Sequence, residues 1–329
     1  MTLEHDTSHG DDTTERGCFQ DRLLQWFDQH KRDLPWRRDR DPYRVWLSEV
    51  MLQQTRVAAV IDHYERFLRR FPTIEKLASA RETSVLAAWS GLGYYRRARM
   101  LHVAARKIVK EHGGKFPSNP EELQALPGIG RYTAAAIASI AFNQPVAVVD
   151  GNVQRVLQRV NGESLGGEKL WSAAGALLSQ QRPGDFNQAV MELGATVCLP
   201  RQPQCMLCPV SDLCTTRGAL RLRRKGTRQT KRDIHYRLAC RDGSIFLVQR
   251  SKTATLMPGM WELPEIASAK STTPSFTLRH SITVTDYAVR VKRGPAPKGF
   301  DGRWVRKARV TTLPLTGLTQ KILRAAKII

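Results

Sequence analysis

Four of the six cysteines in this 329-residue chain crowd into one short segment. The four are Cys198, Cys205, Cys208 and Cys214, with six, two and five residues between them. Four thiolates at this spacing can enclose a tetrahedral zinc ion or a cubane iron–sulfur cluster, and ligand softness does not separate the two. Unligated thiols are the weaker interpretation, because free cysteines rarely cluster. The segment predicts a metal centre with no position left open for a substrate.

Two carboxylates lie beside very apolar sequence. Glu49 is the acid within an otherwise apolar predicted helix, and Asp150 follows the apolar residues 146–149 and precedes another predicted helix. Partial desolvation raises the pKa of a carboxyl group, which suits it to donate a proton near neutral pH. The alternatives are structural: Glu49 could form an ion pair with Arg37 or Arg44, and Asp150 could be a helix N-cap.

Residues 126–133 form a Pro-Gly-Ile-Gly turn that opens an Ala-rich helix continuing to about Phe142. Gly128 and Gly130 allow a tight turn that leaves backbone amides at a helix N-terminus pointing outward, where they can bind a DNA phosphate. Such a turn can also be an ordinary connection. A preceding helix, residues 120–125, favours a complete helix-hairpin-helix.

The charge of the chain favours a polyanionic partner. Lys and Arg number 52 against 30 Asp and Glu, which gives a formal charge of +22. Basic proteins gain affinity for nucleic acids because each neutralised phosphate releases counterions, although a solvated basic surface is the alternative. No run approaches the ~18 apolar residues of a membrane span, and residues 1–15 do not resemble a signal peptide. We expect a cytoplasmic, nucleoid-associated protein that contacts no membrane.

The elements that would position these groups fall into two predicted domains, a mainly α region followed by a small α/β domain. Apolar residues recur at helical spacing from Phe19 to Ala195. Strand-like alternation begins only after a basic stretch, Thr215 to Arg232, with eight Lys or Arg and no acid. We therefore predict four segments. They are a disordered N-terminus (1–16), a helical domain (17–214), a basic linker (215–232) and an α/β domain (233–329).

Within the α/β domain the sequence predicts four short strands and a final helix around Lys321. The strands are 236–240, 244–249, 276–280 and 287–291.

Several motifs together resemble the MutY-type adenine DNA glycosylases of the helix-hairpin-helix, or endonuclease III, superfamily. They are Trp36-Arg37, residues 48–55, the hairpin at 126–133, Gly91-Leu92-Gly93-Tyr94-Tyr95, residues 149–153, the cysteine spacing and Met260-Trp261-Glu262. The resemblance runs from about Phe19 into the last domain. It implies a two-lobed helical glycosylase region with a [4Fe–4S] cluster, followed by a Nudix-like domain that reads the lesion. It also implies that double-stranded DNA with an adenine mispair is the substrate of a monomeric enzyme.

The resemblance assigns the chemistry to four residues. Glu49 would protonate N7 of adenine while the bond to C1′ breaks, and Asp150 would stabilise or trap the oxocarbenium charge on the sugar. Tyr132 and Asn152 would orient these acids. Tyr132 stands where a lysine would supply the Schiff-base nucleophile of a lyase, which implies a monofunctional glycosylase.

The resemblance also implies a DNA-binding set. Gln54 and Tyr94 would wedge into the gap left by the flipped base, and Arg37 and Gln188 would contact that base. Gly128 and Gly130 would hold a backbone phosphate.

The lesion-reading loop departs from the family. A Phe-Ser-His loop after Arg-His is expected, but Arg279-His280-Ser281 is followed here by Ile282-Thr283-Val284. Only the hydroxyl of Thr283 keeps a hydrogen-bonding role, so recognition of 8-oxoguanine would be weaker or rearranged.

Residues 256–264 resemble the entry to a Nudix fold, but no acidic pyrophosphohydrolase run follows. Two alternatives stay open: a glycosylase for another mismatched base, and a non-catalytic, metal-containing DNA-binding protein.

Overall fold

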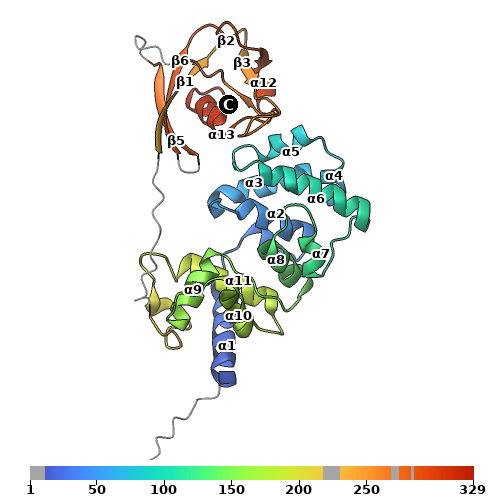
Figure 1. Ribbon diagram of the computed structural model, residues 1–329, viewed down its shortest axis with the longest axis vertical. Coiled ribbons are helices and arrows are strands. Elements are labelled where there is room, and N and C mark those ends of the chain that lie inside the picture. Colours follow the sequence, from blue (N-terminus) through green and yellow to red (C-terminus); the bar gives the residue numbers. More distant parts are fainter. Residues whose placement is uncertain (1–11, 218–229, 268–273, 283–284) are drawn as a thin grey trace, which may run out of the picture. The chain divides into compact units, whose positions relative to one another are not determined.

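The computed structural model describes residues 12–217, 230–267, 274–282 and 285–329 (Figure 1). Its contacts divide the chain into two compact units. The first unit combines residues 1–53 with 115–224, and the second combines 54–114 with 225–329. Each unit is therefore built from two separate stretches of chain, because the polypeptide leaves the first unit after α2 and returns before α7.

The described part of the first unit is helical, as the sequence predicts. Its elements are α1 (Asp12–His30), η1 (Pro35–Arg37), α2 (Pro42–Leu52), α7 (Pro120–Gln124), α8 (Arg131–Phe142), α9 (Gly151–Asn161), α10 (Gly167–Leu177), α11 (Pro183–Thr196) and η2 (Cys205–Leu207). One core joins α1, α9, α10 and α11 around buried residues such as Leu23, Phe27, Leu157 and Phe186. Helix α2 packs on α8, and α8 packs on α11.

The predicted helix-hairpin-helix is present as α7, the turn and α8. Asn119 caps α7 through hydrogen bonds from the amides of Glu121 and Glu122 to its side chain. Gly128 has a φ of 77°, in the left-handed region that glycine adopts at little cost. Gly130, with a φ of −91°, is the N-cap of α8 and has no side chain of its own to cap the helix. The first turn of α8 therefore has no side-chain cap, which leaves its amides open to an acceptor.

The second unit begins with four helices: α3 (Val57–Arg70), α4 (Ile74–Ala78), α5 (Glu82–Trp89) and α6 (Arg96–His112). Its later part is mixed. The strands are β1 (Thr230–Leu238), β2 (Cys240–Arg241), β3 (Ser244–Gln249), β4 (Trp261–Glu262), β5 (Phe276–Ile282), β6 (Thr285–Arg293) and β7 (Gly302–Arg306), and the helices are α12 (Lys307–Val310) and α13 (Gly317–Ala325).

These strands form two sheets. In one, β6 pairs parallel with β1 and antiparallel with β5, and in the other β3 is flanked by β2, β4 and β7. Figure 1 shows α13 between the two sheets, where Ile322 and Leu323 join Leu247 and Val291 in one core. The mixed α/β character and the helix around Lys321 are confirmed.

Each of the four predicted strands overlaps a strand in the described part of the chain, although the predicted strand 236–240 covers the end of β1 and the first residue of β2. The prediction did not separate β2 from β1, and it missed β4 and β7. Strands β2 and β4 are two residues long and β7 is charged and half exposed, so none carries an apolar alternation that marks a strand. Strand β7 exists because β3 pairs with it, from Ser244↔Arg306 to Val248↔Gly302.

The predicted segment boundaries differ in two details from the observed elements. Helix α1 begins at Asp12, inside the N-terminal segment 1–16 predicted to be disordered. The apolar periodicity starts only at Phe19, so it could not mark the polar first turns. At the other boundary, residues 230–232 of the predicted linker already belong to β1. The boundaries at 214 and 233 stay predictions, since residues 218–229 lie outside the described part of the chain. No described helix is both long and apolar enough to span a membrane.

The contact between α11 and α8 requires glycine at position 184. A Cβ atom there would lie 2.5 Å from the carbonyl oxygen of Ser139 and 2.8 Å from Cα of Ile140, both backbone atoms that cannot rotate away. Gly175 in α10 offers a matched control, because a Cβ there meets nothing within 4 Å.

We expect Gly184→Ala to lower the free energy of unfolding by about 1–3 kcal/mol through overpacking. Gly175→Ala should raise it by up to about 1 kcal/mol through helix propensity. Thermal and urea denaturation measure both changes, and equal effects would contradict the packing argument.

Candidate functional site

Glu49 lies on α2 with its side chain turned into the contact with α8. It is only 6% exposed, and the hydroxyl of Tyr132 on α8 donates a hydrogen bond to its Oε2 at 2.5 Å. Burial raises the pKa of Glu49 to about 7, against the opposing effect of the Tyr132 hydrogen bond, and the negative charge of Asp150 adds to the rise. Near neutral pH the protonated and ionised forms of this carboxyl group are therefore present in comparable amounts.

The surroundings of Tyr132 fix its protonation state. Burial and the charges of Glu49 and Asp150 raise its pKa well above the usual value, so the phenol stays protonated and can only donate to the carboxylate. Its oxygen also lies 3.7 Å from Sδ of Met191 on α11. Sequence reasoning did not single out Met191, since a methionine in an apolar helix carries no chemical signal of its own.

Asp150 is the N-cap of α9. Its Oδ1 accepts hydrogen bonds from the amides of Asn152 and Val153 at 2.8 and 2.7 Å, and its Oδ2 accepts one from Nδ2 of Asn152 at 3.0 Å. Asp150 is therefore a helix N-cap, as the structural alternative predicted, but this role does not exclude a chemical one. The capping bonds hold the carboxylate at the positive end of a helix, close enough to Glu49 for its charge to act there.

The chain that leads into Asp150 is held by Asn187 of α11, a buried residue that sequence reasoning missed. Its Nδ2 donates to the Val146 carbonyl at 2.9 Å and to Oγ of Ser139 at 3.0 Å, and its Oδ1 accepts from the amide of Val148 at 3.1 Å. All the hydrogen-bonding groups of this amide are thus used to fix an irregular segment. A buried asparagine inside an apolar helix was the one available signal.

Arginines on α9 connect Asp150 with the cysteine segment. Arg155 donates from Nη2 to Oδ1 of Asn152 at 2.8 Å and from Nε to the Cys198 carbonyl at 2.8 Å. Arg159, four residues on, is 4% exposed and donates to Sγ of Cys198 at 3.2 Å and to the Leu199 carbonyl at 2.8 Å. Their i, i+4 spacing on one helix was the signal that could have identified them.

Helix α11 approaches the start of α9 so closely that only glycine fits at position 194. A Cβ there would lie 2.6 Å from Cβ of Asn152 and 3.1 Å from its carbonyl oxygen. The Gly194 carbonyl also accepts a hydrogen bond from Arg155 at 2.6 Å. Packing and hydrogen bonding therefore fix the position of Asn152 from two sides.

Neither arginine considered as an ion-pair partner of Glu49 is used in that way. Nη2 of Arg37 lies 2.9 Å from Glu192, which also pairs with Arg32, and Arg44 pairs with Asp39. Burial opposes the charge of Glu192, but hydrogen bonds from Arg32 and Arg37 lower its pKa to about 2. Arg37 still acts on Glu49 through its charge, which lowers the pKa of that carboxyl.

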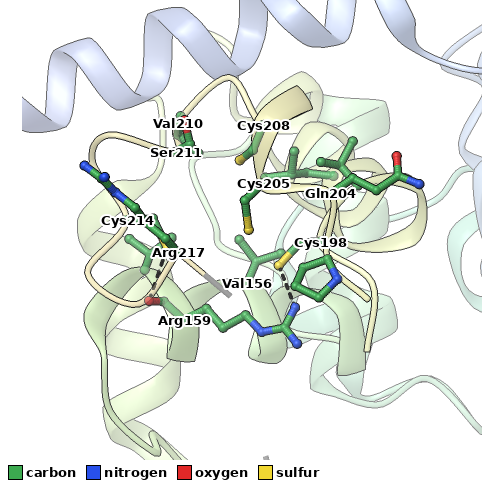
Figure 2. Close-up of a pocket in the computed structure, with 14 residues that line it drawn as sticks. Val156, Arg159, Cys198, Gln204, Cys205, Cys208, Val210, Ser211, Cys214 and Arg217 are labelled. Atoms are coloured by element: carbon green, nitrogen blue, oxygen red, sulfur yellow. Dashed lines mark hydrogen bonds between the residues drawn. The ribbon is translucent and has the colours of Figure 1, made fainter. Parts of the chain in front are cut away.

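All four clustered cysteines line a single pocket of about 400 Å³ that opens to solvent. Figure 2 shows them around this space, with Arg159 bonded to Cys198 at one side. Apolar side chains complete the lining, among them Val156, Val197 and Val210. Burial and the neighbouring thiols raise the pKa of Cys208 to about 11, so binding of a cation here would release protons.

The spacing of the cysteines left two metal centres open, a zinc ion and an iron–sulfur cluster. A zinc ion would draw four sulfur atoms to about 2.3 Å from one point, leaving no space between them. The four thiols line an apolar pocket, and this donor set suits thiolate ligation of either group.

Other residues of the predicted site are divided between the two units. Gln188 is half-buried on α11 in the first unit, whereas Gln54 and Tyr94 belong to the second unit. Gln54 and Tyr94 both have positive φ angles, 55° and 45°, which are rare for residues with a side chain. Thr283 lies outside the described residues. The structure thus brings together Glu49, Tyr132, Asp150 and Asn152, and the roles assigned to the rest stay predictions.

Two protein-family models match the chain. Residues 47–170 match the model described as HhH-GPD superfamily base excision DNA repair protein. Residues 198–214 match the iron–sulfur binding domain of endonuclease III. The second match covers the cysteine segment from its first cysteine to its last, and it confirms the expectation of iron–sulfur chemistry there.

Curated relatives are adenine DNA glycosylases. The Homo sapiens protein of that name is 53% identical over 221 residues, which are 63% of this chain and 40% of the relative. The Arabidopsis thaliana protein is 38% identical over 312 residues, 80% of this chain and 49% of the relative. The chain therefore spans less than half the length of these two relatives.

Solved structures agree on the fold. A thermostable thymine-DNA glycosylase is 32% identical and superposes with a TM-score of 0.60, covering 64% of this chain and 100% of that one. Endonuclease III in a non-covalent complex with DNA superposes with a TM-score of 0.55 at 22% identity, covering 64% and 98% of the two chains, which shows the fold alone.

The raised pKa of Glu49 makes stability depend on pH. The unfolded carboxyl loses its proton near pH 4.5 and the folded one near pH 7, so the folded state holds the extra proton between these values and its stability falls as pH rises through them. Glu49→Gln keeps an acceptor for Tyr132 and removes the titration. We expect the variant to match the parent at pH 4.5 and to gain up to about 3 kcal/mol in unfolding free energy at pH 8. Denaturation at both values measures this; a constant difference would contradict it.

The cysteine pocket predicts iron in the purified protein. Elemental analysis should find about four iron atoms per chain with acid-labile sulfide and visible absorbance, as for a [4Fe–4S] cluster. Cys208→Ser should lower the iron content, whereas Cys240→Ser, at an exposed cysteine far along the chain, should leave it unchanged. Stoichiometric zinc without iron would contradict the assignment.

Proposed function

We propose, since this chain belongs to the HhH-GPD superfamily of base excision DNA repair proteins, that it is a monofunctional adenine DNA glycosylase. Its substrate is duplex DNA in which adenine lies opposite 8-oxoguanine or guanine. The observation that carries the proposal is the buried Tyr132–Glu49 hydrogen bond, with a Glu49 pKa of about 7 beside the capped carboxylate of Asp150. The names of the curated relatives support the choice of adenine.

Glu49 supplies the proton. Adenine leaves deoxyribose slowly until its ring is protonated, and an acid with a pKa near the working pH is best matched to that step. The hydrogen bond from Tyr132 fixes one carboxyl oxygen, which leaves Oε1 as the atom that carries the proton toward N7. Because burial excludes water, the proton passes to the base rather than to solvent.

Asp150 faces the positive charge that develops on the sugar as the bond breaks. The amides of Asn152 and Val153 keep the carboxylate in one orientation, so stabilisation of the oxocarbenium ion needs no rearrangement at the moment of reaction. Either electrostatic stabilisation or transient bond formation at C1′ is open to this carboxylate, and water then completes the hydrolysis. Tyr132 carries no amine for a Schiff base, so the DNA strand stays intact.

DNA binding is supported by the hairpin and by the charge. The uncapped amides at the start of α8 can bind a backbone phosphate at Gly128 and Gly130, and the +22 charge favours the duplex as a whole. Gln54, Tyr94, Arg37 and Gln188 are the residues proposed to meet the extruded base and the gap it leaves. Such a protein would act as a monomer in the cytoplasm, associated with the nucleoid.

The cysteines would hold a [4Fe–4S] cluster, which supplies a rigid cross-link within the lobe rather than a step in the reaction. Cys198, Cys205, Cys208 and Cys214 are the proposed ligands. Arg155 and Arg159 connect this segment to the helix that carries Asp150, so the cluster would help to fix the position of that acid.

The second candidate function is removal of another mismatched base, as the similarity to a thymine-DNA glycosylase suggests. In this case Thr283 and the altered loop around it would read a different opposing base. The two candidates differ in the base that is released.

Incubation with duplexes carrying A:8-oxoguanine, A:G, A:C or T:G, followed by alkali, tests both. We expect alkali-dependent cleavage at adenine, none before alkali, and a release rate that falls as pH rises above about 7 because Glu49 loses its proton. Glu49→Gln should lower single-turnover release by about 10²–10⁴-fold, the contribution of general acid catalysis. Glu163→Gln, at an exposed glutamate of the same unit, is the control and should match the parent. Release of thymine only would refute the adenine assignment.

A further inference from the structure

The turn between α5 and α6, residues Ser90–Tyr95, holds an exposed aromatic side chain on a constrained backbone. Gly91, Gly93 and Tyr94 have φ angles of 108°, 73° and 45°. Tyr94 is 46% exposed, although the left-handed region is unfavourable for a residue with a Cβ atom. Such a conformation persists only where surrounding contacts determine it, which is common where a side chain is presented to a ligand.

One side of the turn is held by α5 and α6 themselves. The guanidinium group of Arg97 lies 5.4 Å from the Tyr94 ring centroid and 5.5 Å from that of Trp89, so it is placed between two aromatic rings. It also donates to the Leu92 carbonyl at 3.4 Å, and Nε1 of Trp89 donates to the Gly93 carbonyl at 3.1 Å. The ring of Tyr94 is therefore supported along one face by a cation.

The other side of the turn is held by residues more than two hundred positions later in the chain. The Leu315 carbonyl accepts two hydrogen bonds, from Oγ of Ser90 at 2.7 Å and from the hydroxyl of Tyr95 at 2.9 Å. Nε2 of Gln320 donates to Oγ of Ser90 at 2.7 Å, and the amide of Gly91 donates to the Tyr95 hydroxyl at 3.4 Å. Ser90, Tyr95 and Leu315 are all buried, so each of these bonds forms away from water.

The approach is too close for a side chain at position 91. A Cβ atom there would lie 3.0 Å from Nε2 of His63 and 3.1 Å from Oε1 of Gln320. His63 also contacts the Ser90 carbonyl at 3.2 Å, so the start of the turn is enclosed by α3 on one side and α13 on the other. Position 91 therefore favours glycine for two reasons: its φ angle is positive, and there is little space for a Cβ atom.

Leu315 is tied to the core of the β-rich part of the unit. The Trp261 amide donates to the Pro314 carbonyl at 2.8 Å, and the Thr316 amide donates to the Trp261 carbonyl at 3.0 Å. Thr316 also caps α13, the helix that carries Gln320. The Met260-Trp261-Glu262 motif has no role in the site described above. It is connected to the turn because Trp261 forms hydrogen bonds with the residues on either side of Leu315.

We propose that Gln320 and the Leu315 carbonyl are positioning groups that lock the Ser90–Tyr95 turn and so present Tyr94 to the DNA duplex for extrusion of the adenine. The inference rests on the proposed glycosylase function and on Tyr94 as the side chain that enters the duplex. It adds a physical route by which the C-terminal, lesion-reading part of the chain controls the extrusion. A tyrosine ring that can rotate freely would fill the gap in the stack only part of the time, and the base would return.

A double-mutant cycle in the full chain tests the route. The variants are Gln320→Ala, Tyr94→Ala and both together, with release from an A:8-oxoguanine duplex measured at saturating protein and extrusion followed by 2-aminopurine fluorescence. We expect Gln320→Ala to lower extrusion and release about tenfold, the effect of one lost hydrogen bond. In the Tyr94→Ala background the same substitution should have no further effect, because Gln320 acts through Tyr94.

Thr319→Val is the matched control. It removes a buried hydroxyl from the same helix, one that accepts a hydrogen bond from the Leu263 amide at 3.2 Å, but it does not touch the turn. It should lower the melting temperature as much as Gln320→Ala while leaving extrusion unchanged. Ser90→Thr, which keeps the hydroxyl, should retain more extrusion than Ser90→Ala.

The outcomes separate the two proposals. Equal effects of Gln320→Ala and Thr319→Val on extrusion, additive effects of Gln320→Ala and Tyr94→Ala, or a Tyr94→Ala variant as active as the parent would each overturn the positioning role while leaving the glycosylase intact. Failure of the parent chain itself to release adenine would instead overturn the proposed function.

Discussion

The hydrogen bond from Tyr132 to Glu49 is the constraint on which the rest of the site depends. It crosses the contact between α2 and α8, where almost no water reaches the carboxyl group. A charge there is costly, so the group keeps its proton up to about pH 7, yet one strong donor fixes its orientation. The capped carboxylate of Asp150 lies close enough for its charge to raise this pKa further, and in the proposed reaction the two acids act together.

Helix α9 is the element that integrates the first unit. Asp150 is its N-cap, and Arg155 and Arg159 donate hydrogen bonds to backbone carbonyls of the cysteine segment. Gly194 lets α11 pack directly on Asn152. Because these contacts join α9 both to α11 and to the cysteine segment, the acid and the proposed cluster belong to one lobe rather than to two independent sites.

In the second unit, too, residues distant in the chain hold a segment in one conformation. The turn that presents Tyr94 is unfavourable by itself and is stabilised by Arg97 on one side and by Leu315 and Gln320 on the other. A segment early in the chain and a segment at its end are thus parts of one folded unit. Along the sequence the helical region is followed by the mixed α/β region, as predicted, and helices α3 to α6 of the helical region belong to the same unit as the mixed region.

The sequence by itself determined what depends on local spacing. The cysteine intervals, the glycine turn before α8 and the helical and alternating periodicities each lie within a few residues, where composition dictates geometry. Only the tertiary structure decided what depends on partners distant in the chain: which hydroxyl binds Glu49, that Arg37 pairs with Glu192, and that Asn187 and Gln320 hold their segments. A pKa or a side-chain orientation is set by the burial and charge around it, and the sequence does not state which distant residues will supply them.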